Sequence, residues 1–456
     1  MKTRSRILRR VCRRFVACSW PALVSWSSVL GQTNKSESPT IPVRTLSAAT
    51  GSSGVFASIF SVRPIGAGGL LVNDAVRRQV VMLDQQLKLS RTVLDSISDN
   101  GREAYGAVAA PLIPYLSDST LFVDREARVL LVIDPAGRVV RSAAVPLGAR
   151  AFQWLSASPS RVDARGNVLL REITNSAIKK SNDPASGEPI EVSKMPDSTY
   201  LLRANFETRK LDTVAALKQV GNLRTIRSRP PNAPSKLRVL VSPIETLDDW
   251  ATLSDGTIAV VRGGDYHVDF FRDGQWQSSA KLPIQWIPLT NADKQRIVDS
   301  TRAYIDSVTS AAAAAYGPQA AAAAQRDAIL GTVKTLPGAS PAAPTPVSDP
   351  GSKAVTPLLP YEFVRFDEMP DYVPPLRSGY TMGDADGNLW ILPTSSAQSE
   401  RGELVYDVVS SKGVLTERVR IPLGRTVVAF GTGGIVYLSH RESKGEWRLE
   451  QRKVVR

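Results

Sequence analysis

The sequence contains very little cysteine. Among its 456 residues there are two, Cys12 and Cys18. Both lie in a segment that we interpret below as a leader, so the mature chain is expected to have no thiol. This excludes disulfide bonds, a cysteine nucleophile and a thiolate metal site from the mature protein. A chain of this length buries enough surface to fold without disulfides.

Histidine is equally scarce, and common catalytic motifs are missing. The two histidines, His267 and His440, stand far apart, and neither HExxH nor GxSxG occurs. The sequence therefore indicates neither a zinc protease of that type nor a hydrolase with a nucleophile elbow. His267 alternates like a strand position in "DYHVDFF", and we interpret it as structural. No residue is predicted to be catalytic.

Acidic residues are absent before Glu37, and the N-terminus is strongly basic. Seven Lys and Arg residues within the first fourteen positions supply half of the net charge of +14. The apolar stretch Phe15–Gly31 that follows is short for a membrane span of about 20 residues, and Pro21 interrupts it. This order predicts a signal peptide over residues 1–31, with an uncleaved anchor as the alternative. We expect an exported protein, periplasmic or extracellular, without stable membrane insertion after leader cleavage.

The rest of the chain has no concentrated basic surface that includes aromatic residues. Without the leader, the net charge falls from +14 to +7. The densest cluster, "LRTIRSRPPNAPSKLR" from Leu223 to Arg238, contains no aromatic side chain. Surfaces that bind single-stranded nucleic acid usually combine both. We therefore predict a solvated loop here and no nucleic-acid partner.

A short pattern occurs six times. Each copy has a turn-forming group, usually with glycine, followed by a run of apolar residues and then by a second apolar segment. Such runs, directly after Gly or Asp-Gly, predict buried strands. The six runs begin at Leu70, Leu121, Val168, Ile258, Leu389 and Ile435.

The spacing of the copies indicates a repeat fold. The runs are 51, 47, 90, 131 and 46 residues apart, so the basic period is near 46 to 51 with extra material in two places. Four-stranded meanders at about 40 to 50 residues are typical of β-propellers. We interpret each apolar run as an inner strand, covered on both faces by neighbouring blades.

The six copies that contain these runs resemble the six-bladed β-propellers of the NHL-repeat and TolB-like type, over residues 41–284 and 379–456. The resemblance implies an all-β fold of six four-stranded antiparallel blades within residues 41–456. It also implies ring closure by a terminal strand, for which "TIPVRTLSA", Thr40–Ala48, is suited. A seventh blade within the 90-residue gap is the alternative.

The 131-residue gap predicts a helical and Pro/Ala-rich insertion, residues 285–378, between blades 4 and 5. A helix is expected to begin near Thr290, whose spacing to Asp293 resembles a capping box. A second helix follows Gly317-Pro318, and Pro337–Lys353 is too poor in apolar residues to order itself. We favour an insertion packed on the rim, and a lid over the central opening is the alternative.

The stretch "GDADGNLWILP", Gly383–Pro393, poses a choice between a calcium loop and a tight turn. An EF-hand loop needs glycine at position 6 and glutamate at position 12. Counted from Asp384, glycine is fourth and the twelfth residue is Ser395. The other copies keep the turn and lose the paired aspartates. We predict a turn before a buried strand.

Polar residues end the apolar runs, and we expect them at the axial opening of the propeller. They form a candidate ligand-binding set without metal ligands: Asn73, Asp74, Asp124, Arg125, Glu172, Arg262 and His440. The predicted function is a non-enzymatic, monomeric binding or scaffold module for a protein, peptide or glycan, without a cofactor. The alternative is a metal-dependent hydrolase or lactonase at the central opening, where Ca²⁺ is the expected ion.

Overall fold

The structure, a computed structural model, is mostly β. Its described residues contain thirty strands and two α-helices, α2 and α3, all within the compact unit Ile41–Arg456. The leader and Arg125 lie outside the described part. The described ranges are 41–66, 68–96, 104–106, 109–124, 127–144, 161–172, 177–183, 187–219, 223–228, 235–331, 357–376, 379–395 and 403–456.

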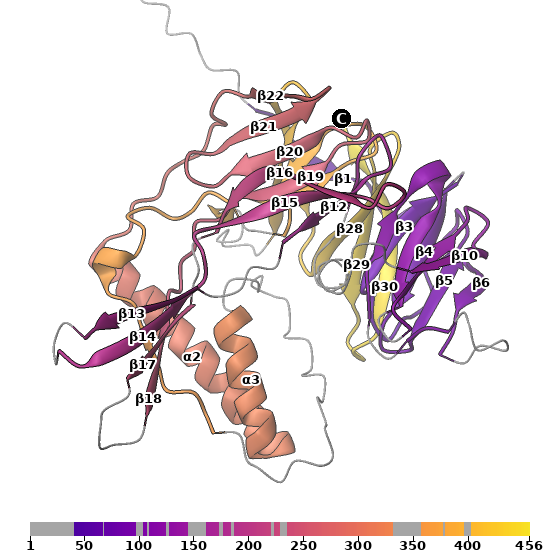
Figure 1. The fold of residues 1–456 in the computed structure, drawn as a ribbon. Helices are drawn as coiled ribbons and strands as arrows, with labels where there is room; N and C mark the ends of the chain where they lie inside the picture. The colour runs from indigo at the N-terminus through magenta and orange to yellow at the C-terminus, as the bar shows by residue number, and fades with distance from the viewer. Residues whose placement is uncertain are drawn as a thin grey trace, which may run out of the picture. The chain divides into compact units, whose positions relative to one another are not determined.

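Four sheets each contain four antiparallel strands (Figure 1). In three of these sheets the four strands are consecutive in the chain. In the remaining sheet, β13 and β14 come between the second and third strands in the sequence. The first two sheets are β3 (Ser61–Ile65), β4 (Gly69–Asp74), β5 (Gln79–Leu83), β6 (Leu89–Leu94), and β7 (Leu112–Pro114), β8 (Thr120–Asp124), β9 (Val129–Ile133), β10 (Val139–Ala144). The next two are β11 (Arg161–Val162), β12 (Val168–Arg171), β15 (Ser198–Asn205), β16 (Lys210–Lys218), and β19 (Asp249–Thr252), β20 (Ile258–Arg262), β21 (His267–Arg272), β22 (Gln275–Ser278).

Two further groups of four strands are joined by the strand nearest the N-terminus. The strand β1 (Val43–Leu46) pairs antiparallel with β30 and parallel with β27, and β2 (Gly51–Ser52) also pairs with β30. The prediction that Thr40–Ala48 contains a closing strand is therefore confirmed. The other members are β24 (Met382–Gly383), β25 (Leu389–Ile391), β26 (Leu404–Val409), β27 (Leu415–Ile421), β28 (Arg425–Gly431), β29 (Ile435–Arg441) and β30 (Trp447–Val455).

The apolar runs form the second strand of each group and are buried on both faces. In β4, Leu70 packs in a cluster with Tyr437 of β29, while Leu71 packs in another with Phe122 of β8. Successive side chains of a strand point to opposite faces, so one run must satisfy two neighbouring sheets. This explains why these strands are apolar at every position rather than at alternate ones.

Another strand precedes each apolar run in its group, and the sequence pattern did not predict these first strands. The first strands contact one another in succession: β28 with β3, then β7, β11, β19 and β24. The runs predicted as innermost are therefore second in their sheets. Four-stranded sheets whose first strands meet in this way are typical of a β-propeller.

The turn prediction for "GDADGNLWILP" is confirmed. The Asp384 N–H donates to the Asn388 carbonyl, and Asp384 Oδ1 accepts from the N–H groups of Asp386 and Asn388 at 3.0 and 2.7 Å. The turns of successive groups also touch. A Cβ added to Gly256, which has φ +81°, would lie 2.3 Å from the Ala164 nitrogen in the preceding turn. The glycines and aspartates of the repeat thus shape turns and pack them together.

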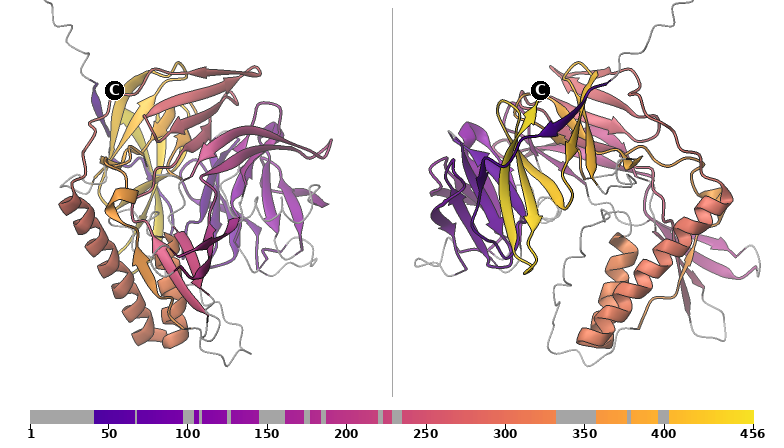
Figure 2. Two further views of the ribbon diagram at one scale, coloured as in Figure 1. Left: turned by 60° about the vertical axis from the view of Figure 1, so that its left-hand side comes forward. Right: turned by 180° about the vertical axis from the view of Figure 1, so that it is seen from behind.

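A separate five-stranded sheet packs with the two helices, and its strands come from separate parts of the chain (Figures 1 and 2). Val239 and Val241 of its fourth strand share a core with Ile305 and Ile329 of the helices. Its strand order is β13 (Ala177–Asn182), β14 (Pro189–Lys194), β17 (Leu223–Ser228), β18 (Lys236–Val241) and β23 (Tyr361–Phe363), and the helices are α2 (Asn291–Tyr316) and α3 (Pro318–Gly331). We call this set the helix-sheet module.

The helix-sheet module corrects one prediction and confirms another. The basic cluster predicted as a solvated loop instead lies on two paired strands, with Arg224 and Arg227 on β17 and Lys236 and Arg238 on β18. Helix α2 begins with the expected capping box, in which Thr290 bonds to the Asp293 backbone and side chain. The strands of the 90-residue gap thus pack with the helices of the 131-residue gap.

Candidate functional site

A cavity of about 720 Å³ lies where the first strands of all six groups meet. Each first strand is hydrogen-bonded to its sheet along one edge, and its other edge is not paired with another strand. Pro64 and Pro114, which have no N–H to donate, are tolerated on such edge strands. We call this space the axial cavity. It is lined by residues 60–64, 111–112, 114, 161–162, 252–254, 382–385 and 427–430.

The first strands approach one another closely around the axial cavity. Gly383 lines it, and a Cβ added there would lie 2.0 Å from the Thr252 carbonyl oxygen of β19. No larger residue fits without moving the backbone. The glycine before "DADGN" is thus required by the contact between two first strands, and its role was not predicted from the sequence.

The walls of the axial cavity are mainly apolar, with three charged residues among them. Phe60, Leu112 and Phe430 belong to the apolar lining, and Arg63, Arg161 and Asp384 are the charged residues. Apolar walls with a few polar groups are the usual composition of a small-molecule site. The three charged residues differ in their partners within the protein.

Asp384 is engaged by its own turn and strand. Besides two backbone N–H groups at Oδ1, its Oδ2 accepts from Asn388 Nδ2 at 3.0 Å and from Trp390 Nε1 at 2.9 Å. Four donors satisfy most of the acceptor capacity of a carboxylate. Asp384 therefore has a structural role at the cavity wall.

Arg63 is buried and held by the neighbouring turn. Its Nη2 donates to Asp118 Oδ1 at 2.9 Å and to the Ser119 carbonyl at 3.0 Å, and its Nη1 donates to the Pro64 carbonyl at 2.6 Å. Burial lowers the pKa of Arg63, and the Asp118 carboxylate opposes this shift. Its Nε has no hydrogen-bond partner in the part of the chain that the structure describes.

Arg161 lies near a buried carboxyl group at the start of β19. Burial lowers the pKa of Arg161, and the charge of Asp249 opposes that shift. Arg171 of β12 is affected in the same way, with Asp249 again opposing the fall in its pKa, and it donates to Gln219 Oε1 at 3.1 Å. Two guanidinium groups therefore share the field of one carboxyl group beside the axial cavity.

Asp249 joins this group to a distant segment. It is 5% exposed, and its Oδ2 accepts from the Gly379 and Thr381 N–H groups at 2.8 and 3.0 Å. Burial raises the pKa of Asp249, and these hydrogen bonds oppose the rise. The segment that it holds leads directly into Met382 and Gly383 of the cavity wall.

Of the residues predicted at the axial opening, those that the structure describes lie at the ends of second strands and are not among the residues that line the axial cavity. Asn73 Nδ2 donates to the Ala110 carbonyl, and Asn73 Oδ1 accepts from the hydroxyl of Tyr105, whose pKa burial raises to about 12. Asp74 accepts from the Ala57 and Ser58 N–H groups at 2.8 and 3.0 Å. Asn73 and Asp74 thus connect β4 by hydrogen bonds to the segments that contain Ala57 and Ala110.

The other described members of the set also contact their own surroundings. Asp124 accepts from the Ala127 N–H, and the Glu172 carbonyl accepts from the Thr199 hydroxyl. Arg262 donates to Asp248 and Asp269 at 2.8 and 2.6 Å, and His440 Nδ1 lies 3.4 Å from Glu450 Oε1. A ligand-binding role for these residues, and for Arg125, stays a prediction.

Two findings concern metals and membranes. Among the residues that the structure describes, no group of three or more His, Cys, Asp or Glu side chains is arranged to hold a metal ion. No helix in that part of the chain has the length and apolar character needed to cross a membrane. A calcium site stays an untested prediction.

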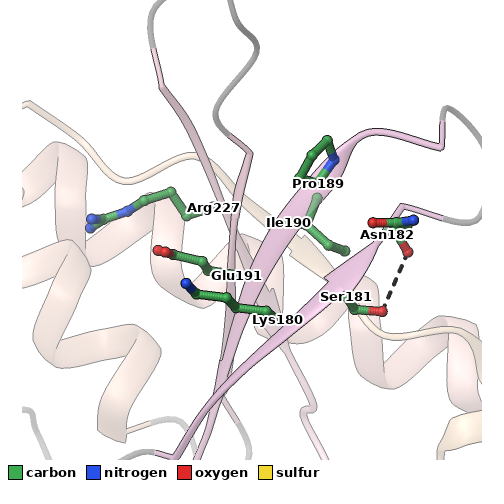
Figure 3. A pocket seen from close by; sticks show the side chains of 7 residues that line it. All are labelled: Lys180, Ser181, Asn182, Pro189, Ile190, Glu191 and Arg227. Atoms are coloured by element: carbon green, nitrogen blue, oxygen red, sulfur yellow. Dashed lines mark hydrogen bonds between the residues drawn. The ribbon is translucent and has the colours of Figure 1, made fainter.

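A second hollow, of about 360 Å³, lies on the sheet of the helix-sheet module. Figure 3 shows Lys180, Glu191 and Arg227 extending in the same direction from adjacent strands, in agreement with their cross-strand register. Ser181, Asn182, Pro189 and Ile190 complete its lining. It lies on three strands of one sheet, whereas the axial cavity is enclosed by six groups.

No protein-family model matches the sequence, and no curated protein does. Solved structures are similar in fold. A DUF4221-family member from Bacteroides vulgatus is 9% identical with a TM-score of 0.41, covering 90% of this chain and 98% of its own. A putative exported protein from Bacteroides fragilis is 8% identical with a TM-score of 0.38, covering 88% and 92%. A catalytically inactive virginiamycin B lyase from Staphylococcus aureus, with quinupristin, is 7% identical with a TM-score of 0.33, covering 90% and 98%.

The neighbours include several enzymes by name. Besides the lyase, they include a putative gluconolactonase and a regucalcin from Agrobacterium tumefaciens, a calcium-binding protein. They are β-propellers of the virginiamycin B lyase and gluconolactonase type. Such low identities and TM-scores carry no argument about what this chain binds or catalyses. The NHL-repeat or TolB-like type stays a prediction.

Proposed function

We propose that this chain is an exported six-bladed β-propeller that binds a small ligand in its axial cavity. The six groups of four strands are its blades, and β1 completes the last one. The observation that carries the proposal is the lining of the cavity, to which the first strand of every group contributes. Closure of the ring therefore creates the site.

The dimensions and composition of the axial cavity favour a small molecule over a broad protein surface. Its volume of about 720 Å³ falls within the range of roughly 300–1,000 Å³ that is usual for ligand pockets. Its walls combine apolar side chains with the edges of first strands that are not paired with another strand.

The second candidate function is turnover at the same site by a hydrolase or lactonase. The observation that favours it is Asp249, a buried carboxyl group with a raised pKa beside two arginines near the cavity wall. Such perturbed carboxyl groups are often catalytic acids or bases. If the reaction depends on Ca²⁺, metal analysis of the purified protein finds stoichiometric calcium, and a chelator lowers its melting temperature.

Binding in the axial cavity is tested with phenylnaphthylamine, a neutral apolar fluorescent probe. We expect one site per chain and loss of that site in Ala385→Trp, because Ala385 lines the cavity and an indole there fills it. Ala136→Trp is the control, since Ala136 is an exposed residue of the Asp134–Arg138 turn. Equal binding by both variants, or no binding by the unmodified chain, contradicts the proposal.

A further inference from the structure

We infer that the ligand of the axial cavity is a flat aromatic molecule and that Phe60 binds it, an inference that rests on the proposed function. Phe60 comes directly before β3 and is one of the residues that line the cavity. It is 50% exposed, although a phenyl group gains more than most side chains from burial. An aromatic side chain that stays open to a cavity offers a contact surface to a ligand.

The apolar residues on either side of Phe60 anchor its segment in the core. Phe56 is buried in a hydrophobic cluster, and Ile59 and Val62 pack against the same cluster. The Phe56 and Trp447 N–H groups also donate to each other's carbonyl groups, at 2.8 and 2.9 Å. Phe60 is not part of that cluster. The segment is therefore held by its neighbours, while Phe60 remains half-exposed at the cavity wall.

The end of β4 fixes the backbone that carries Phe60. The fully buried Asp74 carboxylate accepts from the Ala57 and Ser58 N–H groups at 2.8 and 3.0 Å. The Phe60 N–H itself donates to the Asn73 carbonyl at 2.9 Å. A side chain held in place before the ligand arrives loses little conformational freedom on binding, which favours affinity. In this proposal Asn73 and Asp74 are positioning residues for Phe60.

Other residues of the cavity wall also favour an aromatic ligand. Phe430 of β28 lines the cavity, and its ring centroid lies 4.7 Å from that of the buried Trp390, which holds the ring in place. Met382 lines the cavity as well, and a thioether makes favourable contacts with aromatic rings. Aromatic rings attract one another beyond the effect of buried area. A flat aromatic ligand gains these contacts, whereas a saturated ligand of the same size gains only from burial.

The test compares 2-naphthol with decahydro-2-naphthol, its saturated counterpart, on the full chain. The two neutral alcohols share a carbon skeleton, but only 2-naphthol is flat and aromatic. We expect 2-naphthol to bind the unmodified protein more tightly, by roughly three- to ten-fold, which is the usual strength of contacts between aromatic rings. Calorimetric titration measures both affinities, and competition with phenylnaphthylamine assigns them to the axial cavity.

Matched variants identify the contribution of the Phe60 ring. Phe60→Leu keeps an apolar side chain without the ring, so the affinity for 2-naphthol should fall by roughly three- to ten-fold while that for decahydro-2-naphthol is unchanged. Phe60→Tyr keeps the ring and should retain the preference. Tyr200→Leu is the control, because Tyr200 is an exposed aromatic residue on β15 that is not among those lining the cavity. It should leave both affinities unchanged.

Two results overturn the inference while the cavity remains a ligand site. One is equal affinity of the unmodified chain for the two alcohols, which needs no variant. The other is an equal loss of both affinities in Phe60→Leu when urea denaturation shows its stability to be unchanged, as expected for a half-exposed residue. If phenylnaphthylamine does not bind at all, the proposed function itself fails, and the two failures are thus distinguished.

Discussion

Two kinds of buried or half-buried carboxyl group, in turns and at the start of a strand, differ in where their hydrogen-bond partners lie. In the turns, Asp384 and Asp134 accept N–H groups two and four residues ahead in the chain. At the start of β19, Asp249 instead accepts from Gly379 and Thr381, 130 and 132 residues away. The first kind holds a turn together, and the second holds two distant segments beside a cavity.

The electrostatic consequences of the two arrangements are opposite. Burial opposes the charge of Asp134, but hydrogen bonds and the charge of Arg138 outweigh it, and its pKa is lowered. Burial dominates at Asp249, and its pKa is raised. The same residue type is therefore a stable anion in the Asp134 turn and an acid with a raised pKa at the start of β19. The second state is the one associated with functional sites.

The largest expected effect comes from removing a turn carboxylate that also supports the core. Asp384→Ala leaves Trp390 Nε1 and Asn388 Nδ2 without their acceptor, and Trp390 is fully buried. We expect the free energy of unfolding to fall by about 3 kcal/mol, measured by urea denaturation. Asp84→Ala in a turn with two backbone hydrogen bonds is the control, with an expected loss of about 1 kcal/mol. Equal losses would show that the Trp390 contact contributes nothing.

The opposite pKa shifts of Asp249 and Asp134 predict opposite changes of stability with pH. Because the folded-state pKa of Asp249 is raised, its ionisation is more costly in the folded chain than in the unfolded one. Its contribution to stability is therefore present below the unfolded value of about 3.9 and is lost as the pH rises toward the folded value. The stability of the unmodified chain relative to Asp249→Asn should fall as the pH is raised from about 4.

Asp134→Asn provides the comparison of opposite sign. Its folded-state pKa is lowered, so its stabilising contribution is present above the unfolded value and disappears as the pH falls. The stability of the unmodified chain relative to Asp134→Asn should rise with pH over the acidic range. Urea denaturation of both variants at several pH values measures the slopes. Slopes of the same sign would contradict the distinction between turn and strand-start carboxyl groups.

The smallest expected effect concerns a turn carboxylate that joins two groups of strands. Asp386 accepts from the Gly433 and Gly434 N–H groups, both at 2.8 Å. Asp386→Ala exposes these N–H groups to water, which satisfies them in part, so we expect a loss of about 1 kcal/mol. Thermal and urea denaturation measure it. A loss as large as that of Asp384→Ala would indicate that contacts between turns, rather than within them, stabilise the repeat.

Local patterns explain what the sequence could predict. The turns and apolar runs were found because the hydrogen-bond partners of a turn residue such as Asp384 lie within a few residues. The start of α2 at Thr290 and Asp293 was found for the same reason, because a short sequence contains both the signal and the constraint that produces it. The strand in Thr40–Ala48 pairs with distant strands, and it was expected only from the resemblance to known propellers.

Distant pairing explains what the sequence could not predict. The first strands are short and mixed in polarity, as in Arg161–Val162 and Met382–Gly383, because one edge faces the axial cavity. Their residues therefore lack the apolar pattern of the second strands, and the cavity wall was missed. Arg224 and Arg238 lie on β17 and β18, which pair with each other, but the outer neighbours of this pair, β14 and β23, come from other parts of the chain, so the sheet was not apparent from the local sequence.

The most direct test of the account is to locate a bound ligand. A crystal of the full chain grown with a brominated aromatic carboxylate gives an anomalous signal at the bromine. We predict a peak within the axial cavity. A peak in the hollow lined by Lys180, Glu191 and Arg227, with the axial cavity empty, would contradict the claim that ring closure creates the site.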